Sequence, residues 1–427
     1  MEKQLLAAAV ETDITPPVGA DFDGYSAREG TSLGVHDPLL AQLLLLKSGA
    51  DQVVLISMDL LGVELDFTQR VRLGIQQAIG VPAHCTVVAC SHTHSGAAGF
   101  LPALAGIRRS EDPELQSIVA RKLVGAAIWA RGRLQPVRLG VGKGAVEGIG
   151  RNRNNPESGP VDDEVIVLRV DDKAGTPLAV LMNYGCHPTV MGYQNLLFSA
   201  DYPGAARATL RRIYPETIFM YTNGASGDVS TRFTRREQTF AEVERMGRIL
   251  AGEVLKVIQS IVVQESVDLG AHVEPMELKF RSFPAAEEAK RKMERLQTKL
   301  EELKAAGASH GEIRRATTQV EGATAQVLLA KEFAGRTHSN SQVQVLRIGD
   351  LALVGLPGEP FTRTVLEIKS LSKHPCTAVV SHSNDEQGYF PDAASVAEGT
   401  YEALISPYGA DVAEGVRDVA LQLLRKD

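Results

Sequence analysis

The sequence predicts an α/β protein of mixed α+β type, with mixed β-sheets flanked by helices and one inserted antiparallel helical hairpin. Three observations predict this class. Apolar runs rich in β-branched residues alternate with amphipathic segments of helical period through the first half of the chain. A charge-rich helical segment interrupts this alternation near residue 285. After it, strand-like sequence returns and ends in a Gly-Pro turn.

Strands are predicted where short apolar runs are bounded by turn residues. Residues 39–49 and 51–62 are two such runs around a turn at 48–50. The other predicted strands are 7–17 with its closing turn, 84–90, 161–172, 176–187, 217–230 with its glycine-rich turn, and 343–361.

Helices are predicted between these strands from apolar residues at helical spacing. In residues 66–80, Val71, Ile75 and Ile79 recur at steps of four, which places them on one helix face. Amphipathic helices are predicted in the same way at 116–133 and 202–214.

Residues 285–333 differ from the rest of the chain because they are helical in period and rich in charge. GASHG (307–311) separates two apolar stripes, which predicts an antiparallel helical hairpin. The favoured role is a structural buttress. One alternative is a lid. The other is a dimerisation arm, through which the protein would form a homo-oligomer. No interdomain linker stands out, so residues 1–427 are expected to form a single domain. The stripes consist of Met293, Leu296, Leu300, Leu303, and of Ile313, Ala316, Val320, Ala323, Val327.

Composition excludes several function classes. The net charge is -7, from 45 basic and 52 acidic residues, which argues against a nucleic-acid partner. No apolar run approaches the length of a membrane span. The four cysteines form no CxxC pair, so free thiols in a reducing compartment are expected. No secretory signal is visible, which favours the cytoplasm; the alternative is a secreted protein whose signal has been removed.

The stretch SHTHSG holds the first candidate site residues, His92 and His94, directly after a predicted strand. The His-x-His spacing puts both rings on the same side of an extended backbone. Two metal ligands, or one ligand beside an acid–base histidine, would suit this arrangement. The HxHxDH pattern fails because Gly96 and Ala97 stand where Asp and His belong, and HExxH is absent. A pair of turn-capping histidines is the structural alternative.

Three later segments add candidates. His187 also ends an apolar strand and is a plausible third imidazole, although a core histidine is the alternative; the neighbouring Cys186 points to the opposite face. Asp228 and Ser230 follow a glycine-rich turn, where they would position a substrate or, as the alternative, cap the turn; the GxSxG serine-hydrolase pattern is absent. Glu359 stands in a Pro-Gly turn after a buried strand. Histidines with a carboxylate indicate a metal-dependent hydrolase of the zinc type.

The segment LGVGKGAVEG (139–148) is a decoy. It resembles the GxGxxG fingerprint but has Ala145 at the third glycine, so no dinucleotide site is predicted there.

Several of these motifs occur together in an order that resembles the neutral, non-lysosomal ceramidase family. The resemblance covers nearly the whole chain and looks like the family's N-terminal catalytic domain, without the separate C-terminal immunoglobulin-like domain. It implies a zinc-dependent amidase. The motifs are DITPPVG (13–19), GY (24–25), GVHDPLLAQ, SHTHSG, GCHPT, GASGDVS, LPGE and GYF followed by GTYEA.

The resemblance also implies roles for individual residues. One zinc ion per chain would be held by four ligands, namely His92, His187, Glu359 and Tyr389. The other site residues would be His94 as substrate contact and acid, Tyr401 as oxyanion donor, Ser230 as an orienting residue, and Arg153, with Arg151 as its rival. GDVSPN of the ceramidases becomes GDVSTR here, so that rim of the pocket is altered.

The resemblance therefore predicts hydrolysis of the N-acyl amide bond of ceramide or of a related, smaller and more soluble N-acyl substrate. Two alternatives stay open at this point. One is a metal-dependent hydrolase of esters or phosphoesters, and the other is a non-catalytic binding protein with a degenerate site.

Overall fold

The computed structural model describes residues 4–102 and 111–426. Its larger sheet has eight strands in the order β11-β9-β8-β6-β1-β3-β4-β5. The pairs β4–β5 and β11–β9 are parallel, and the other neighbours are antiparallel. The strands are β1 (Leu5–Asp13), β3 (Leu40–Ser48), β4 (Asp51–Met58), β5 (Thr86–Cys90), β6 (Gln135–Ala145), β8 (Glu164–Asp172), β9 (Pro177–Tyr184) and β11 (Ile218–Asn223).

A second sheet of four strands packs against the first. Its order is β13 (Leu269–Lys279), β14 (His338–Ile348), β15 (Leu351–Gly355) and β17 (Cys376–Val380). One buried cluster joins the two inner faces, for example Leu55 and Val87 from the first sheet with Leu353 and Ala378 from the second. The mixed sheets confirm the predicted α+β class.

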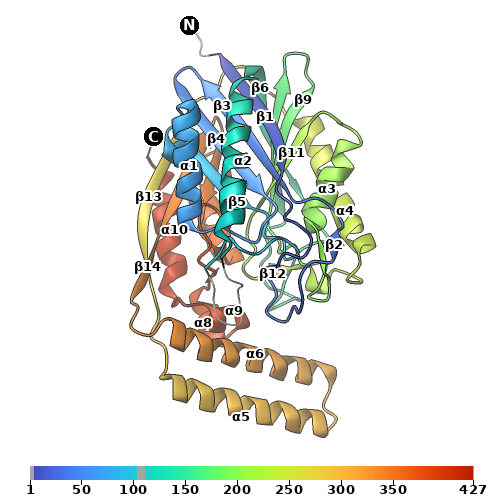
Figure 1. The fold of residues 1–427 in the computed structure, drawn as a ribbon, viewed down its shortest axis with the longest axis vertical. Helices are drawn as coiled ribbons and strands as arrows, with labels where there is room; N and C mark the ends of the chain where they lie inside the picture. The colour runs from blue at the N-terminus through green and yellow to red at the C-terminus, as the bar shows by residue number, and fades with distance from the viewer. Residues whose placement is uncertain (1–3, 103–110, 427) are drawn as a thin grey trace.

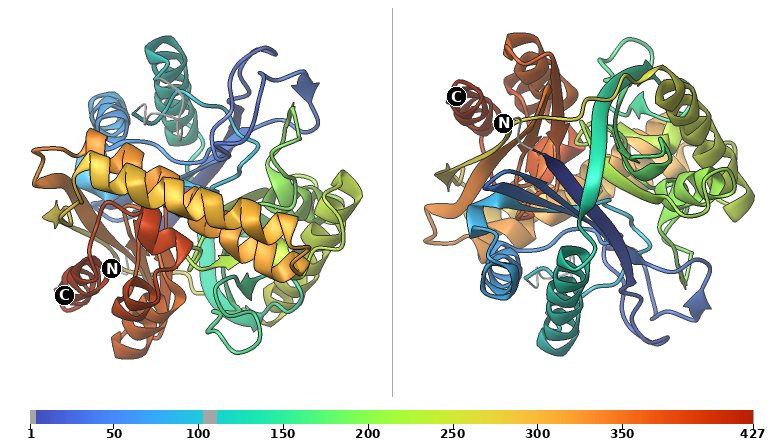
Figure 2. Two further views of the ribbon diagram at one scale, coloured as in Figure 1. Left: turned by 90° about the horizontal axis from the view of Figure 1, so that it is seen from below. Right: turned by 90° about the horizontal axis from the view of Figure 1, so that it is seen from above.

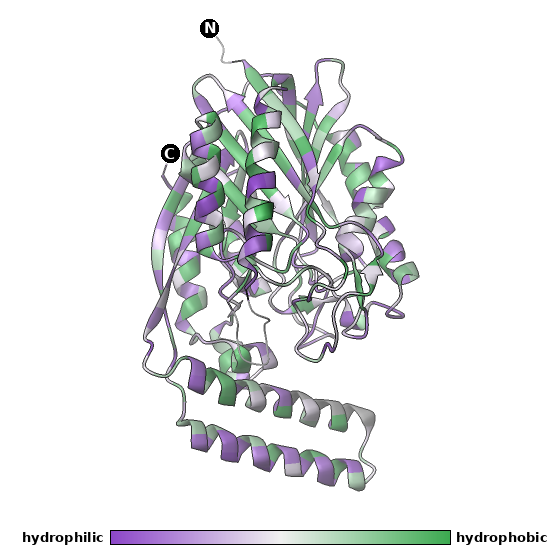
Figure 3. Cartoon of the chain, viewed as in Figure 1, coloured by the Kyte–Doolittle hydropathy of each residue, from purple (hydrophilic) through white to green (hydrophobic). Residues whose placement is uncertain are grey.

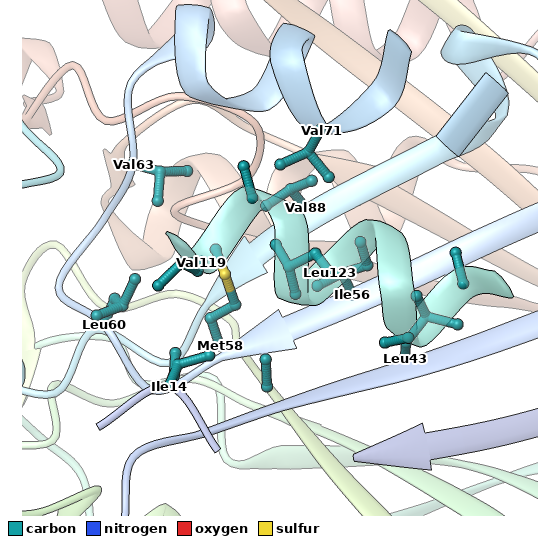
Figure 4. Packing of buried hydrophobic residues seen from close by; sticks show 14 of the residues in the cluster. Ile14, Leu43, Ile56, Met58, Leu60, Val63, Val71, Val88, Val119 and Leu123 are labelled. Carbon is teal, nitrogen blue, oxygen red and sulfur yellow. The ribbon is translucent and has the colours of Figure 1, made fainter. Parts of the chain in front are cut away.

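Helices cover both outer faces, so the body has four layers (Figures 1 and 2). On the first sheet, α1 (Leu65–Ile79) and α2 (Pro113–Arg131) cover one half, while α3 (Asp201–Arg211) and α4 (Phe240–Ser260) cover the other. Figure 4 shows Val119 and Leu123 of α2 packing over Ile56 and Met58. On the second sheet the covering helices are α7 (Thr362–Leu371) and α10 (Asp411–Leu423).

Short elements and loops gather at one end of the body. They include the two-residue strands β2 (Gly34–Val35), β7 (Arg151–Asn152), β10 (Leu197–Phe198), β12 (Val229–Ser230), β16 (Glu359–Pro360) and β18 (Tyr389–Phe390), the 3-10 turn η2 (Thr231–Phe233), and the helices α8 (Ala393–Glu398) and α9 (Tyr401–Ile405). The other 3-10 turn, η1 (Ala83–Cys85), instead precedes the amino end of β5. Most of them connect the carboxyl ends of the long strands, which is where functional residues usually lie.

The predicted hairpin is present as α5 (Ala286–Ala305) and α6 (His310–Glu332), between β13 and β14. It lies across the loop end of the body (Figures 1 and 2). Ser309 and Glu312 form a reciprocal capping box at the start of α6, which fixes the turn. The outward turns of α5 are mainly hydrophilic, whereas the strands of the body are mainly hydrophobic (Figure 3). Among the described residues, no helix has the length and apolar character needed to cross a bilayer.

Sequence reasoning missed several of the longer elements, namely α4, α7, α10, β6, β13 and β17. Strand β6 (Gln135–Ala145) explains the glycines of LGVGKGAVEG, the segment that resembles a dinucleotide fingerprint. Gly140, Gly142 and Gly144 lie on one strand face, where the chain at the end of α4 approaches closely. A Cβ at Gly140 would lie 2.2 Å from the backbone oxygen of Val262. The glycines of this segment therefore serve helix–strand packing.

Candidate metal centre

The four expected ligands lie in segments that follow the carboxyl ends of strands in both sheets. His92 follows β5 and His187 follows β9, while Glu359 begins β16 and Tyr389 begins β18. Strands β16 and β18 pair in parallel with Glu359 opposite Tyr389. Because the two sheets face each other, these ends meet although the residues are far apart in sequence.

The polar atoms of these residues converge at short range. His187 Nε2 lies 3.0 Å from Glu359 Oε2, and His92 Nε2 lies 3.6 Å from the same oxygen. The Tyr389 hydroxyl lies 3.4 Å from His187 Nε2. His92, His187 and Glu359 are 3%, 0% and 6% exposed, so the cluster is nearly closed to solvent.

Backbone carbonyls fix the orientation of both ligand imidazoles. His92 Nδ1 donates to the Leu61 oxygen at 2.8 Å. His187 Nδ1 donates to the Ser226 oxygen at 2.6 Å and to the Val229 oxygen at 3.1 Å. This assignment leaves both Nε2 lone pairs aimed at Glu359, as is usual for histidines that bind a metal.

The cluster fits a metal cation. Burial, with a contribution from His382, lowers the pKa of His92 to about 3, and burial holds the pKa of His187 well below its ordinary value. Both rings are therefore neutral. Among the described residues, Glu359 Oε2 has no hydrogen-bond donor, although two nitrogen lone pairs face it. Acceptors opposed in this way repel unless a cation or a proton lies between them. Two imidazoles, a carboxylate and a phenol oxygen form a donor set of the kind that zinc accepts.

His94 also reaches the cluster, but it is held differently. Its Nε2 lies 3.3 Å from His92 Nε2, and the ligand nitrogens of His92, His94 and His187 lie within 4.8 Å of one another. Its Nδ1 is buried without a hydrogen-bond partner in the part of the chain that the structure describes. The contrast with His92 and His187 sets His94 apart from the two imidazoles whose orientation the backbone fixes.

The structure brings Arg153 to the cluster and leaves Arg151 outside it. Arg153 Nη2 donates to the Tyr389 hydroxyl at 3.0 Å and to the Gly227 oxygen at 2.6 Å. Its Nε lies 2.7 Å from Glu402 Oε1. Arg151 is exposed and donates to the Pro156 oxygen. Sequence reasoning missed the buried Glu402, although its place directly after Tyr401 was a usable signal.

The other candidates are distributed around the cluster. Tyr401 lines a cavity of about 490 Å³ together with His92, His94, Glu359 and Tyr389. Ser230 forms a β-bridge beside His187, and its hydroxyl accepts a hydrogen bond from the Arg232 N–H.

Asp228 has a structural role instead of the substrate-positioning role that its turn suggested. Its carboxylate accepts hydrogen bonds from the N–H and hydroxyl of Thr362 and from Asn152 Nδ2. Cys90 and Cys186 are buried free thiols, as expected for core cysteines.

Comparisons with known proteins identify the family of the chain. The family described as "Neutral/alkaline non-lysosomal ceramidase, N-terminal" matches residues 6–231. Neutral ceramidase A of Dictyostelium discoideum is 28% identical over 219 residues, which are 45% of this chain and 30% of that protein. Neutral ceramidase B of the same organism is 32% identical over 135 residues, 27% of this chain and 18% of that protein. The aligned part is thus less than a third of either relative.

Two solved structures share the fold. The neutral ceramidase from Pseudomonas aeruginosa has a TM-score of 0.79 at 18% identity, over 99% of this chain and 74% of that one. A structure titled "Ceramidase complexed with C2" has a TM-score of 0.77 at 17% identity, over 99% of this chain and 75% of that one. Because the family match covers more than half of the 427 residues, the chain belongs to the neutral/alkaline non-lysosomal ceramidase family.

Proposed function

We propose that the protein is a zinc-dependent amidohydrolase that cleaves the N-acyl amide bond of ceramide or of a smaller, more soluble N-acyl compound. One observation carries the proposal. His92 Nε2, His187 Nε2 and Glu359 Oε2 converge in a buried cluster beside the Tyr389 hydroxyl. Membership of the ceramidase family supports an amide as the bond that is cleaved.

In this proposal, His92, His187, Glu359 and Tyr389 hold one zinc ion. When bound, zinc supplies Lewis-acid chemistry, because it polarises a carbonyl oxygen and lowers the pKa of a water molecule. Arg153 keeps the Tyr389 hydroxyl in place through its hydrogen bond of 3.0 Å. Glu402 in turn anchors Arg153 at 2.7 Å, so the position of Tyr389 depends on both residues.

His94 moves the proton. Its ring is neutral at neutral pH, because burial, with contributions from His92 and His187, holds its pKa well below the ordinary value, so one ring nitrogen is free to accept a proton. It accepts a proton from the attacking water as the oxygen–carbon bond forms. It then gives this proton to the departing nitrogen as the carbon–nitrogen bond breaks. Tyr401 donates a hydrogen bond to the developing oxyanion. Ser230 is not among the described residues that line the cavity, so it supports the site through its β-bridge beside His187.

The cavity that opens from the cluster accommodates the acyl part. It has a volume of about 490 Å³ and extends from His94 to the end of α6, where Leu329 and Phe333 line it. Its walls also carry carboxylates, such as Glu64 and Asp385. An apolar wall beside a polar one suits a compact N-acyl compound with a polar group.

The proposal is tested by zinc content and hydrolysis in wild type and in Glu359→Ala. We expect one zinc per wild-type chain, hydrolysis of N-acyl amides, and loss of both in the variant. Glu242→Ala is the matched control, because Glu242 is also buried but lies in α4 and pairs with Arg245. It should keep both zinc and activity. Hydrolysis of phosphoester probes alone would contradict the amidase, and a wild type that takes up no added zinc would contradict the metal centre.

A further inference from the structure

A chain of three buried side chains lies directly behind the metal centre. His382 Nδ1 lies 2.6 Å from Glu386 Oε2, and His382 Nε2 lies 3.0 Å from the Ser226 hydroxyl. Ser226 and His382 are 0% exposed and Glu386 is 5% exposed. The carboxylate fixes the proton on Nδ1, so Nε2 accepts the hydrogen bond that Ser226 donates.

This chain contacts the supports of all four proposed ligands. The Ser226 carbonyl accepts the Nδ1–H of His187 at 2.6 Å. The His382 ring stacks on His92 with centroids 3.7 Å apart and planes 11° apart. Glu386 Oε1 accepts from the Gly388 N–H at 3.0 Å, directly before Tyr389. The Gly388 carbonyl accepts from the Glu359 N–H at 2.9 Å.

We propose that Ser226, His382 and Glu386 act as positioning residues that hold the ligand side chains in the orientation needed to bind the metal. The proposal rests on the proposed metal centre. Holding the site has a conformational cost, because His382 and Asn384 adopt the left-handed region with φ of 53° and 66°. Non-glycine residues keep such a backbone only where the surroundings enforce it.

Two other readings of the same residues fail on geometry. A Ser-His-Glu order resembles a nucleophilic triad, but Ser226 is fully buried and is absent from the described residues that line the cavity. A second metal site at His92, His382 and Glu386 would need the lone pairs of two nearly parallel stacked rings to meet at one ion. Moreover, His382 Nδ1 already donates to Glu386. Positioning is the role that remains.

The test compares zinc affinity, measured by competition with a chromophoric chelator. His382→Phe keeps a ring for stacking but removes both nitrogens, and should weaken zinc binding by roughly 10- to 100-fold. Ser226→Ala should weaken it by a smaller factor. Ser383→Ala is the matched control, because Ser383 is equally buried and its hydroxyl has no hydrogen-bond partner among the described residues. It should bind zinc like the wild type.

A second readout needs no metal. Nitrogen-15 spectra of the metal-free protein should show His92 and His187 as the fixed Nδ1–H tautomer in the wild type and in Ser383→Ala, and as mixed tautomers in His382→Phe. If the wild type binds no zinc, the proposed metal centre is wrong. These spectra still decide whether Ser226, His382 and Glu386 position the two imidazole rings. Equal zinc affinity in Ser226→Ala, His382→Phe and Ser383→Ala, with unchanged tautomers, would overturn the proposal.

Discussion

At the scale of single residues, side-chain type and spacing identified most residues of the candidate site. They did not identify the hydrogen bonds and ring contacts that orient those residues. The His-x-His spacing predicted two rings on one side, and the Nε2 atoms of His92 and His94 do lie 3.3 Å apart. Which ring is held for a ligand role could not be predicted. It depends on whether Nδ1 meets a backbone carbonyl, and the Leu61 carbonyl that holds His92 comes from another strand end. His382 was missed for the same reason, because only the folded chain brings it under His92.

Gly24 permits the close approach of its loop to His94. A Cβ at Gly24 would lie 2.7 Å from His94 Cγ. We expect Gly24→Ala to displace the ring and lower kcat/KM by roughly tenfold or more, since misplaced catalytic groups lose their orientation. Gly19→Ala is the control: its φ is +99° against +103° at Gly24, so the backbone strain is similar, but no described residue has an atom within 4 Å of the added Cβ. Equal losses in the two variants would mean that strain alone matters.

Arg153 holds Tyr389 and Glu402 at once, which a lysine cannot do in the same plane. We expect Arg153→Lys to lower kcat/KM by roughly 10- to 100-fold, because a hydrogen bond involving a charged group contributes about 1.5–3 kcal/mol. Arg151→Lys alters an exposed side chain two residues away and should leave kcat/KM near the wild-type value. The reverse ranking in steady-state assays would assign the site arginine to Arg151.

At the scale of elements, periodicity predicted the helices and strands whose apolar faces are regular, including the hairpin. Helix α4 was missed although its buried Val243, Leu250 and Val254 follow a helical period. Strand β6 was missed because its glycines carry no apolar side chains to alternate. Strand pairing could not be predicted at all. The contact of His187 with Glu359 depends on two sheets packing face to face, and local sequence patterns do not determine that packing.

The position of α6 beside the site makes the hairpin a part of the substrate cavity. Leu329 and Leu300 are 1% and 4% exposed, so truncation to alanine should cost each variant about 2–5 kcal/mol of unfolding free energy. Of these two residues, Leu329 lines the cavity, and Leu300 is not among the described residues that line it. We therefore expect Leu329→Ala, and not Leu300→Ala, to shift the KM series for N-acyl amides of increasing chain length toward longer chains. Parallel KM series in the two variants would show that the hairpin is only a buttress.

At the scale of the whole molecule, two packed sheets turn their strand ends toward one end of the body, and the hairpin lies across that end (Figure 1). The class of fold was predictable although single strands and covering helices such as β6, α7 and α10 were missed, because the alternation of apolar strands with amphipathic helices was clear in the first half of the chain. The face-to-face packing brings His92 and His187, which follow strands of one sheet, against Glu359 and Tyr389 of the short pair β16–β18, which comes after strands of the other. A metal ion bound there would therefore join the two halves of the molecule. Its removal should lower the free energy of unfolding of the whole protein.

Chelation should lower the melting temperature of the wild type by several degrees, because a ligand present at 1,000 times its Kd stabilises the native state by about 4 kcal/mol. Glu359→Gln should melt at the same temperature with and without chelator. In the metal-free state, Glu359 Oε2 faces the His187 Nε2 lone pair at 3.0 Å, whereas a glutamine can donate its amide N–H to that nitrogen. Metal-free Glu359→Gln should therefore be at least as stable as metal-free wild type in calorimetry. A variant that stays chelator-sensitive, or that melts well below the metal-free wild type, would show that Glu359 serves the fold and not the metal.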